Sequence, residues 1–351
     1  SHLPPSRIGV VAPTIGDDER QDGEWIARRD VDMRLVRNSA TSRQFDSAPA
    51  GVAAESGTQL AGQGGFDAMP NGPIGRPAAH GSQPMITARN VTISYPGTKS
   101  GPAVIDGVDL AIGAGSIVSL IGPSGCGKST LLKAMAGLVA PTQGQIEVAG
   151  TSAAAAAQRR LVGLVFQEAN LLPWKNALDN AAFLLQVSDR SVSRKEAHER
   201  AADNLKLVGL GHALQKLPSQ LSGGMRQRVS IARALTLNPQ ILLMDEPFGA
   251  LDAITREEMS YLMLDIWERT QKTIVLVTHS IDEAVLLSHD VHVMGAHPGR
   301  IICSITVPLG FPRNNASFAD ARFRETEILL RDRLIESHGS RGSAASAEER
   351  K

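Results

Sequence analysis

The 351-residue sequence has only two cysteines, no net charge and no apolar run that approaches the about 18 residues needed to span a bilayer. Two cysteines cannot build a disulfide framework, which is typical of a protein from a reducing compartment. The 36 basic and 36 acidic side chains cancel, so the composition favours neither nucleic acid nor an anionic membrane as a partner. We therefore expect no nucleic-acid partner and a chain that is soluble or peripheral to a membrane.

The first 84 residues lack lysine and show no sustained helical or strand periodicity. They are rich in Gly, Ala, Ser, Pro, Asp and Arg, and the breaker clusters Gly62–Gly65 and Pro70–Pro73 lie close together. This composition predicts a disordered N-terminal extension over residues 1–84, with a partner-binding arm as the alternative. The rest of the chain predicts one domain over residues 85–310, followed by a C-terminal helix and a disordered tail over residues 311–351.

A glycine-rich stretch matches the pattern G-x-x-x-x-G-K-[ST] of phosphate-binding loops. It follows the apolar run Ser116–Ile121, which predicts a buried strand, and leads into Thr130–Leu138, which predicts an amphipathic helix. A glycine-rich hairpin that contains Gly-Lys-Ser by chance would not need these flanks, so the order of elements favours a nucleotide site. The loop consists of Gly122, Pro123, Ser124, Gly125, Cys126, Gly127, Lys128, Ser129 and Thr130.

The residue types in this loop suit the chemistry of a bound phosphate. Its glycines let the backbone turn so that successive N–H groups point into one concavity, and the helix that begins at Lys128 adds its positive end. Lys128 supplies a mobile point charge for the outer phosphates, and the Ser129 hydroxyl can bind Mg²⁺.

Polar residues also end three other apolar strands of the predicted sheet. Gln167 follows one of them, Asp245 and Glu246 close the second, and His279 follows the third. Ligands of parallel α/β sheets sit at these carboxyl ends. Asp245 suits a Mg²⁺ shell, Gln167 can reach the metal or a water, and Glu246 can face an attacking water. The alternatives are a solvated strand end for the carboxylates and a structural role for the histidine.

Two further features each permit two interpretations. Ser222, Gly223 and Gly224 precede a helix, so they predict either a second anion site or an ordinary N-capped helix. Tyr95 lies at a strand end, where it is either a stacking platform for a purine or an ordinary cross-strand aromatic. Spacing alone does not separate these interpretations.

Several segments between the predicted strands carry the sequence pattern of helices. Ser193, Thr255 and Ser280 each precede a glutamate by three residues, which is the capping-box pattern and predicts three helix starts. The segment Leu171–Trp174 is apolar in a loop position and predicts either local core packing or an exposed patch for a partner.

Together these motifs resemble the ATP-binding subunit of ABC transporters, over roughly residues 85–308. The correspondence covers the Walker A loop (Gly122–Thr130), the Q-loop (Gln167), the signature (Leu221–Gln227), Walker B (Ile241–Glu246), the D-loop (Ala250–Asp252), the switch histidine (His279) and the adenine-stacking aromatic (Tyr95). Three stretches resemble the nitrate/sulfonate/taurine importer branch, namely Leu171–Trp174, Asp245–Asp252 and Met294–Arg300. Met225 departs from the glutamine common in the signature, and Gly295–Pro298 varies the usual loop of the branch.

The resemblance implies an α/β fold, a P-loop NTPase with a RecA-like core, an antiparallel β subdomain and an α-helical signature subdomain at about residues 170–235. It implies ATP and Mg²⁺ as cofactors and a head-to-tail dimer with a second copy, in which each ATP lies between Walker A of one chain and the signature of the other. Such a dimer would explain why one chain carries two anion sites.

The resemblance also implies a role for each matched residue. Tyr95 would stack on adenine, and the loop amides with Lys128 would hold the phosphates. Ser129, Gln167 and Asp245 would complete the Mg²⁺ shell. Glu246 would polarise the attacking water, with His279 near the γ-phosphate. Ser222, Gly223 and Gly224 would close the site from the second copy.

The implied function is that of an ATP-hydrolysing subunit of an importer for a small anionic solute of the nitrate, sulfonate or taurine type. We expect it at the cytoplasmic face of the inner membrane, peripheral to it, with a transmembrane permease subunit as partner and, indirectly, a solute-binding protein. The alternatives are an importer ATPase for another solute and a soluble non-transport ABC ATPase. The about one hundred residues between Walker A and the signature leave no room for the long coiled coil of the DNA-repair type.

Overall fold

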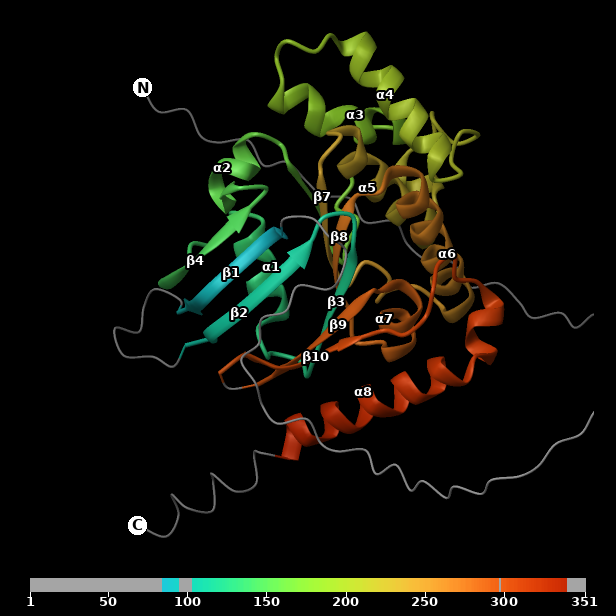
Figure 1. Cartoon of the computed structure of the whole chain (residues 1–351). Coiled ribbons are helices and arrows are strands. Elements are labelled where there is room, and N and C mark those ends of the chain that lie inside the picture. Colours follow the sequence, from blue (N-terminus) through green and yellow to red (C-terminus); the bar gives the residue numbers. More distant parts are fainter. Residues whose placement is uncertain (1–83, 95–102, 297, 340–351) are drawn as a thin grey trace, which may run out of the picture. The chain divides into compact units, whose positions relative to one another are not determined.

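The computed structural model describes residues 84–94, 103–296 and 298–339 (Figure 1). The chain divides into the units Ser1–Asp67 and Ala68–Lys351, and every described residue belongs to the second unit. The predicted N-terminal extension up to residue 83, the predicted stacking residue Tyr95 and the predicted tail beyond Gly339 lie outside the described residues.

The described residues form two sheets. The larger has the order β10-β9-β3-β8-β7-β6, in which β10 is antiparallel to β9 and the other neighbours are parallel. Its strands are β3 (Ile117–Ile121), β6 (Val162–Val165), β7 (Ile241–Asp245), β8 (Thr273–Val277), β9 (Asp290–Gly295) and β10 (Arg300–Thr306). The smaller sheet is antiparallel and has the order β2-β1-β4-β5, formed by β1 (Pro84–Ile93), β2 (Ile105–Gly113), β4 (Gln143–Val148) and β5 (Thr151–Ser152).

The apolar runs explain why the larger sheet is parallel and covered on both faces. Strands β3 and β8 are buried at every position, and β7 is buried at all but its last residue. Helix α1 (Lys128–Met135) shares one buried apolar cluster with both sheets, and its Leu131, Leu132 and Met135 are fully buried (Figure 1). The phosphate-loop helix is therefore fixed by packing on two sides.

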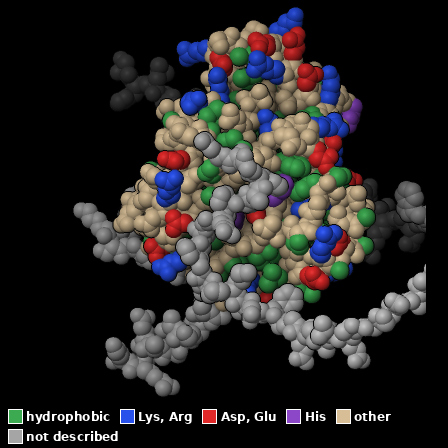
Figure 2. Space-filling view, in the orientation of Figure 1, with side chains coloured by type: hydrophobic (Ala, Val, Ile, Leu, Met, Phe, Trp, Pro, Cys, Tyr) green, Lys and Arg blue, Asp and Glu red, His purple; other side chains and the backbone are tan. Residues whose placement is uncertain are grey.

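Three helices form a separate layer beside strand β6. They are α3 (Ala177–Ser188), α4 (Arg194–Leu207) and α5 (Gly223–Thr236). Ala181, Ala197 and Ala201 are fully buried, and such small side chains let the helices approach closely. Side chains of both charges mix on the surface over α4, at the top of Figure 2. Ser193 caps α4 by accepting a hydrogen bond from the Glu196 amide, as predicted.

The prediction that Thr255 caps the helix α6 (Ala253–Thr270) is wrong, because Asp252 is the N-cap. Its carboxylate accepts the Thr255 amide at 3.0 Å, and the hydrogen bonds from Thr255 hold the pKa of Asp252 below its ordinary value. Aspartate is a stronger N-cap than threonine. The short helix α2 (Ala153–Gln158) is absent from the sequence predictions, since its five alanines carry no apolar periodicity.

The C-terminal part of the domain is tied to helix α7 (Ile281–Leu287), which Ser280 caps as predicted. Arg313 is 4% exposed, and its guanidinium donates to the carbonyls of Val285 and Ser288 at 2.7 and 2.8 Å. Helix α8 (Ala321–Gly339) follows the short turn η2 (Asn315–Ala319) and packs on α7 and β9 (Figure 1).

Candidate nucleotide site

The phosphate loop joins the end of β3 to the start of α1. Gly125 and Gly127 have φ angles of 77° and 97°, a region that favours glycine, so the loop can turn here at little cost. A Cβ at Gly127 would lie 2.4 Å from Ile105 Cδ1. The buried Lys128 ammonium donates to the carbonyls of Gly122 and Pro123 at 2.9 and 3.0 Å. The sharp turn and the inward lysine place positive charge and backbone amides within one loop.

The first strand-end carboxylate lies against this loop. The Ser129 hydroxyl donates to Asp245 Oδ1 at 2.7 Å, although the two residues are 116 positions apart in the sequence. Asp245 is the last residue of β7, and Ser129 lies in the first turn of α1. The structure thus brings together two residues that the resemblance assigns to one Mg²⁺ shell.

The second strand-end carboxylate lies beside the predicted switch histidine. His279 Nδ1 is 3.3 Å from Glu246 Oε2. Glu246 has a φ of 45°, which costs a non-glycine residue on the order of 1 kcal/mol. Its amide donates to the Val277 carbonyl at 2.9 Å and holds the turn against the end of β8. The strained turn separates the directions of Asp245 and Glu246, so one carboxylate meets the loop and the other meets the histidine.

Gln167 borders the same turn. A Cβ added at Gly249 would lie 3.5 Å from Gln167 Nε2 and 3.5 Å from Glu246 Oε2. The segment around Gln167 is held by helix α5, because Gln227 donates to the Phe166 carbonyl at 3.1 Å and Arg233 donates to the Ala169 carbonyl at 2.7 Å. Burial lowers the pKa of Arg233 from its ordinary value.

Sequence reasoning missed the roles of Gln227 and Arg233 as links between the signature helix and the Gln167 segment. For Gln227 a signal existed: it lies three residues after Gly224 and four before Ile231, so it is a polar residue on the apolar face of α5. Arg233 gives no comparable signal, because an arginine late in a helix is ordinarily solvated.

The structure does not bring Ser222, Gly223 and Gly224 to the phosphate loop of the same chain. Ser222 caps α5 by accepting the Met225 amide at 3.2 Å. Within the described residues, the near neighbours of the two glycines include Leu251 and Thr255, which belong to the segment after β7. Ser222 and Gly223 are exposed, whereas Gly224 is buried. The three residues therefore form an open helix N-terminus separate from the loop.

A third residue whose role sequence reasoning missed, Gly299, supports the phosphate loop on the side of β10. A Cβ there would lie 2.1 Å from the Cys126 carbonyl oxygen. The Gly299 amide donates to the Val104 carbonyl at 2.9 Å, and its carbonyl accepts the Asp106 amide at 3.0 Å. Cys126 itself is fully buried, and burial raises the pKa of its thiol. The segment before β10 thus sets the position of the loop.

A glycine-rich loop between a buried strand and a helix, with an aspartate, a glutamate and a histidine at neighbouring strand ends, defines a nucleotide-hydrolysing P-loop protein. None of the helices in residues 84–94, 103–296 and 298–339 has the length and apolar character required to cross a bilayer.

Comparison with known proteins narrows the class. A sequence model of the ABC transporter family matches residues 105–249. The chain is 43% identical over 258 residues to the taurine import ATP-binding protein TauB of Pseudomonas aeruginosa, covering 72% of this chain and 96% of the relative. It is 40% identical over 243 residues to the bicarbonate transport ATP-binding protein CmpD of Synechocystis sp., covering 69% and 86% of the two chains.

A solved structure agrees with these sequence relatives. The dimeric post-hydrolysis state of the ATP-binding cassette MJ0796, bound to ADP and Pi, superposes with a TM-score of 0.57 at 35% identity, over 65% of this chain and all of the other. The chain belongs to the ABC transporter family. It is a nucleotide-binding ATPase subunit with the α/β P-loop fold that the sequence predicts, and it resembles the importer branch of the family.

Proposed function

We propose that this protein hydrolyses ATP to drive uptake of a small anionic solute of the nitrate, sulfonate or taurine type through a separate membrane subunit. The observation that carries the catalytic part is the pairing of Ser129 with Asp245 and of Glu246 with His279 at neighbouring strand ends. The solute class is supported by the relatives, which include taurine and bicarbonate transport proteins.

The phosphate loop would hold the nucleotide. The nine residues Gly122 to Thr130 would offer their backbone amides and the Lys128 ammonium to the phosphates. For Lys128 this requires release of its two loop carbonyls, because the same donors would turn to a phosphate. Tyr95, outside the described residues, remains the expected stacking partner of adenine.

The donors near the loop fit Mg²⁺. Ser129, Asp245 and Gln167 offer a hydroxyl, a carboxylate and an amide oxygen, and this ion prefers a few hard oxygen ligands alongside substrate phosphates. The phosphates of the bound nucleotide would share in binding the ion, because Mg²⁺ is usually held by one or two protein carboxylates together with substrate phosphates. Bound there, Mg²⁺ would neutralise charge on the outer phosphates.

Glu246 and His279 would carry the chemistry. Glu246 would accept a hydrogen bond from the attacking water and orient it in line with the γ-phosphate, since phosphoryl transfer depends mainly on positioning and charge stabilisation. His279, 3.3 Å from the Glu246 carboxylate, would hold that carboxylate in place and contact the γ-phosphate side of the site.

The open N-terminus of α5 would complete the site of a second copy. Ser222, Gly223 and Gly224 lie apart from the loop of their own chain, so their amides would meet a nucleotide bound to another chain in a head-to-tail dimer. The dimeric state of the MJ0796 cassette supports this arrangement. The departure at Met225 leaves the capping hydrogen bond of Ser222 in place.

A membrane permease would dock beside the Gln167 segment. Trp174 is 71% exposed, although tryptophan is among the most apolar side chains. The fully buried Asn180 holds the preceding loop rigid, because it accepts the Leu172 amide at 2.7 Å and donates to the Lys175 carbonyl at 2.8 Å. We place the protein at the cytoplasmic face of the inner membrane, with a solute-binding protein as an indirect partner.

The domain boundaries follow from this function: an ATP-binding domain over residues 85–310, with a helical part at about 170–235, and a C-terminal region over 311–351.

The substitution Glu246→Gln tests the catalytic assignment. It keeps the size of the side chain and removes the charge, so we expect ATP binding to persist, turnover to fall by about 10² or more, and an ATP-bound dimer to accumulate. Turnover and size-exclusion chromatography with ATP measure this, and near wild-type turnover would refute the role of Glu246.

Uptake of labelled taurine, nitrate and bicarbonate by cells that carry the wild-type or the Glu246→Gln form tests the solute class.

A further inference from the structure

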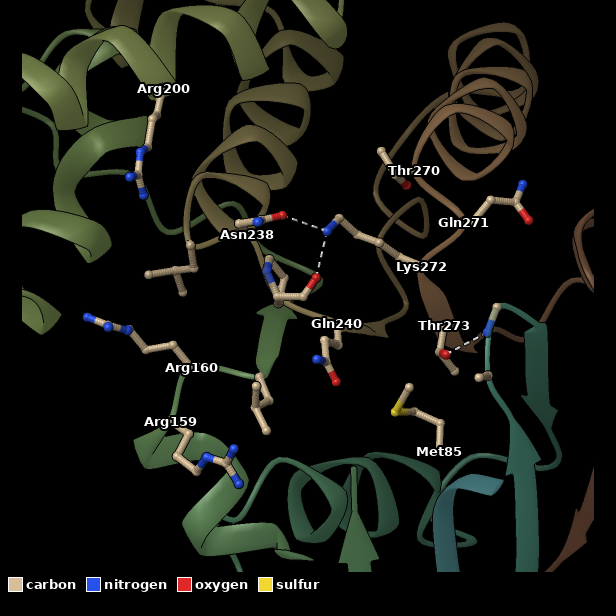
Figure 3. Close-up of a pocket in the computed structure, with 15 residues that line it drawn as sticks. Met85, Arg159, Arg160, Arg200, Asn238, Gln240, Thr270, Gln271, Lys272 and Thr273 are labelled. Atoms are coloured by element: carbon tan, nitrogen blue, oxygen red, sulfur yellow. Dashed lines mark hydrogen bonds between the residues drawn. The ribbon is translucent and has the colours of Figure 1, made fainter. Parts of the chain in front are cut away.

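A second pocket lies at the opposite edge of the parallel sheet (Figure 3). It has a volume of about 530 Å³ and is bordered by residues just before or at the start of four strands. Gly115 precedes β3, Leu161 precedes β6, Gln240 precedes β7, and Thr273 begins β8. The phosphate loop, Gln167 and His279 follow the other ends of the same strands, and Asp245 is the last residue of β7. The pocket is therefore distinct from the nucleotide site.

The pocket is lined by cations and carries no carboxylate or aromatic side chain among its lining residues. Arg159, Arg160 and Arg200 lie on one side of the opening, and Lys272 lies across from them (Figure 3). These cations come from three parts of the fold: the turn after α2, helix α4, and the loop before β8. Because positive side chains from three separate elements surround one hollow, the positive electrostatic potential is concentrated there.

The charge of this cluster is only partly neutralised by its neighbours. Arg160 pairs with Asp189 at 2.7 Å, and Arg200 pairs with Glu196, both outside the pocket lining. The Arg159 guanidinium has no hydrogen-bond or ion-pair partner within residues 84–94, 103–296 and 298–339.

Within the described part of the chain, the Lys272 ammonium is held by neutral groups alone. Its ammonium donates to Asn238 Oδ1 at 3.0 Å and to the Pro239 carbonyl at 2.6 Å (Figure 3). Burial lowers the pKa of Lys272 from its ordinary value. A partly buried cation with no counter-ion among the described residues gains most from an anion brought close to it.

We propose that this pocket binds a small polyanion that carries phosphate groups and no aromatic base. The volume lies within the about 300–1,000 Å³ of small-molecule sites. Arginine forks bind phosphate oxygens through two parallel hydrogen bonds, which a halide cannot accept, and four cations around one hollow favour a multiply charged phosphate group over a single carboxylate. A nucleobase would require a stacking surface, and none of the lining residues is aromatic.

Such a ligand would join two layers of the protein. Arg200 belongs to α4 in the helical layer, whereas Arg159 and Lys272 belong to the edge of the sheet. One polyanion that contacts both sides would hold the layers together, so binding stabilises the folded chain against unfolding.

Inorganic pyrophosphate is the probe for this site. It is titrated calorimetrically into the full chain with saturating ADP, so that the phosphate loop is occupied. We expect binding to wild type, and Arg159→Ala to raise the Kd about tenfold, which corresponds to 1.4 kcal/mol. Arg159 is exposed and its guanidinium has no partner among the described residues, so we expect folding to be unaffected. Arg331→Ala, an equal charge change on an exposed residue of α8, is the matched control and leaves the Kd unchanged.

The double variant Arg159→Ala/Arg200→Ala weakens pyrophosphate further, while its affinity for ADP stays at the wild-type value. Absence of pyrophosphate binding to wild type, or equal affinity in wild type and the double variant, overturns the proposal. A thermal shift with pyrophosphate that survives in the double variant overturns it as well. Loss of ADP binding in every form would count against the nucleotide site and not against this pocket, which the same titration without ADP then tests.

Discussion

The substitution Gly299→Ala tests whether the segment before β10 positions the phosphate loop. Gly299 has no φ in the left-handed region, so alanine suits its backbone. The obstacle is steric, because the new Cβ would lie 2.1 Å from the Cys126 carbonyl oxygen and 2.9 Å from the Val104 carbonyl oxygen. Both atoms belong to backbone and cannot rotate away. Either the loop or the segment before β10 therefore has to move.

The size of the movement sets the expected effect. Ordinary contact begins at 3.4 Å, so the Cys126 carbonyl must retreat by about 1.3 Å unless β10 shifts instead. Overpacking of this kind costs about 1–3 kcal/mol of stability. A displacement near 1 Å at a reacting group lowers catalysis by about 10². We expect ATP affinity to fall about tenfold and turnover to fall about a hundredfold.

Equilibrium titration with a fluorescent ATP analogue and steady-state turnover measure both effects, and urea unfolding measures the loss of stability. Gly310→Ala is the matched control, because a Cβ there has no atom within 4 Å and the residue has no left-handed φ. Wild-type affinity and turnover in Gly299→Ala, with stability equal to that of the control, would show that the loop is not supported from this side.

Two further predictions address docking and pH. Trp174→Asp, which replaces an exposed apolar side chain, is expected to leave ATP affinity unchanged and to abolish ATP-driven uptake, and full uptake would contradict a docking role. Burial and the neighbouring Asp282 raise the pKa of Glu327 to about 7. The folded state therefore binds this proton more tightly than the unfolded chain, so the stabilisation is complete below about pH 4.5 and is lost as the pH rises to about 7. We expect wild type to lose roughly 1 kcal/mol across this window, after allowance for solvent screening, whereas Glu327→Gln removes this part of the loss. Urea unfolding at pH 5 and 8 measures it, with Glu325→Gln as control, and an unchanged pH dependence in Glu327→Gln would contradict the assignment.

The parts of the site that depend on local pattern could be predicted from the sequence. Lys128 and Ser129 sit in a loop whose glycine spacing is itself the signal, and Asp245 and His279 each end a buried apolar run. Parallel strands bring their carboxyl ends together, so the contact between Ser129 and Asp245 follows from topology once the strands are recognised.

The parts that depend on three-dimensional packing could not be predicted. The role of Gly299 depends on its close approach to the carbonyl of Cys126, 173 positions earlier in the sequence. No periodicity of the sequence predicts that contact. Asp252 and not Thr255 caps α6, and the capping-box pattern does not distinguish a cap from a residue in the first turn of the helix. The basic pocket is assembled from arginines that are ordinary surface residues when considered singly.

Gly223 and Gly224 differ in a way that separates folding from function. A Cβ at Gly224 would lie 2.6 Å from Thr255 Cγ2, so glycine is needed there for the chain's own packing. At Gly223 the nearest atom would be Leu251 Cδ2 at 3.7 Å, which is ordinary contact, and the φ is not left-handed. The fold therefore does not require glycine at position 223, and under the proposed dimer a nucleotide bound to a second copy is what would exclude a side chain there.

The substitution Gly223→Ala is the test. Alanine in a helical position should keep or raise the stability by up to about 1 kcal/mol, measured by urea unfolding. Placed together with Glu246→Gln, it should abolish the ATP-dependent dimer, because a methyl group would stand between the α5 amides and the phosphate they approach. Nucleotide affinity of the separate chain should stay unchanged, since Gly223 lies apart from its own loop. A double variant that dimerises with ATP as readily as Glu246→Gln alone would mean that no ligand approaches the backbone of residue 223.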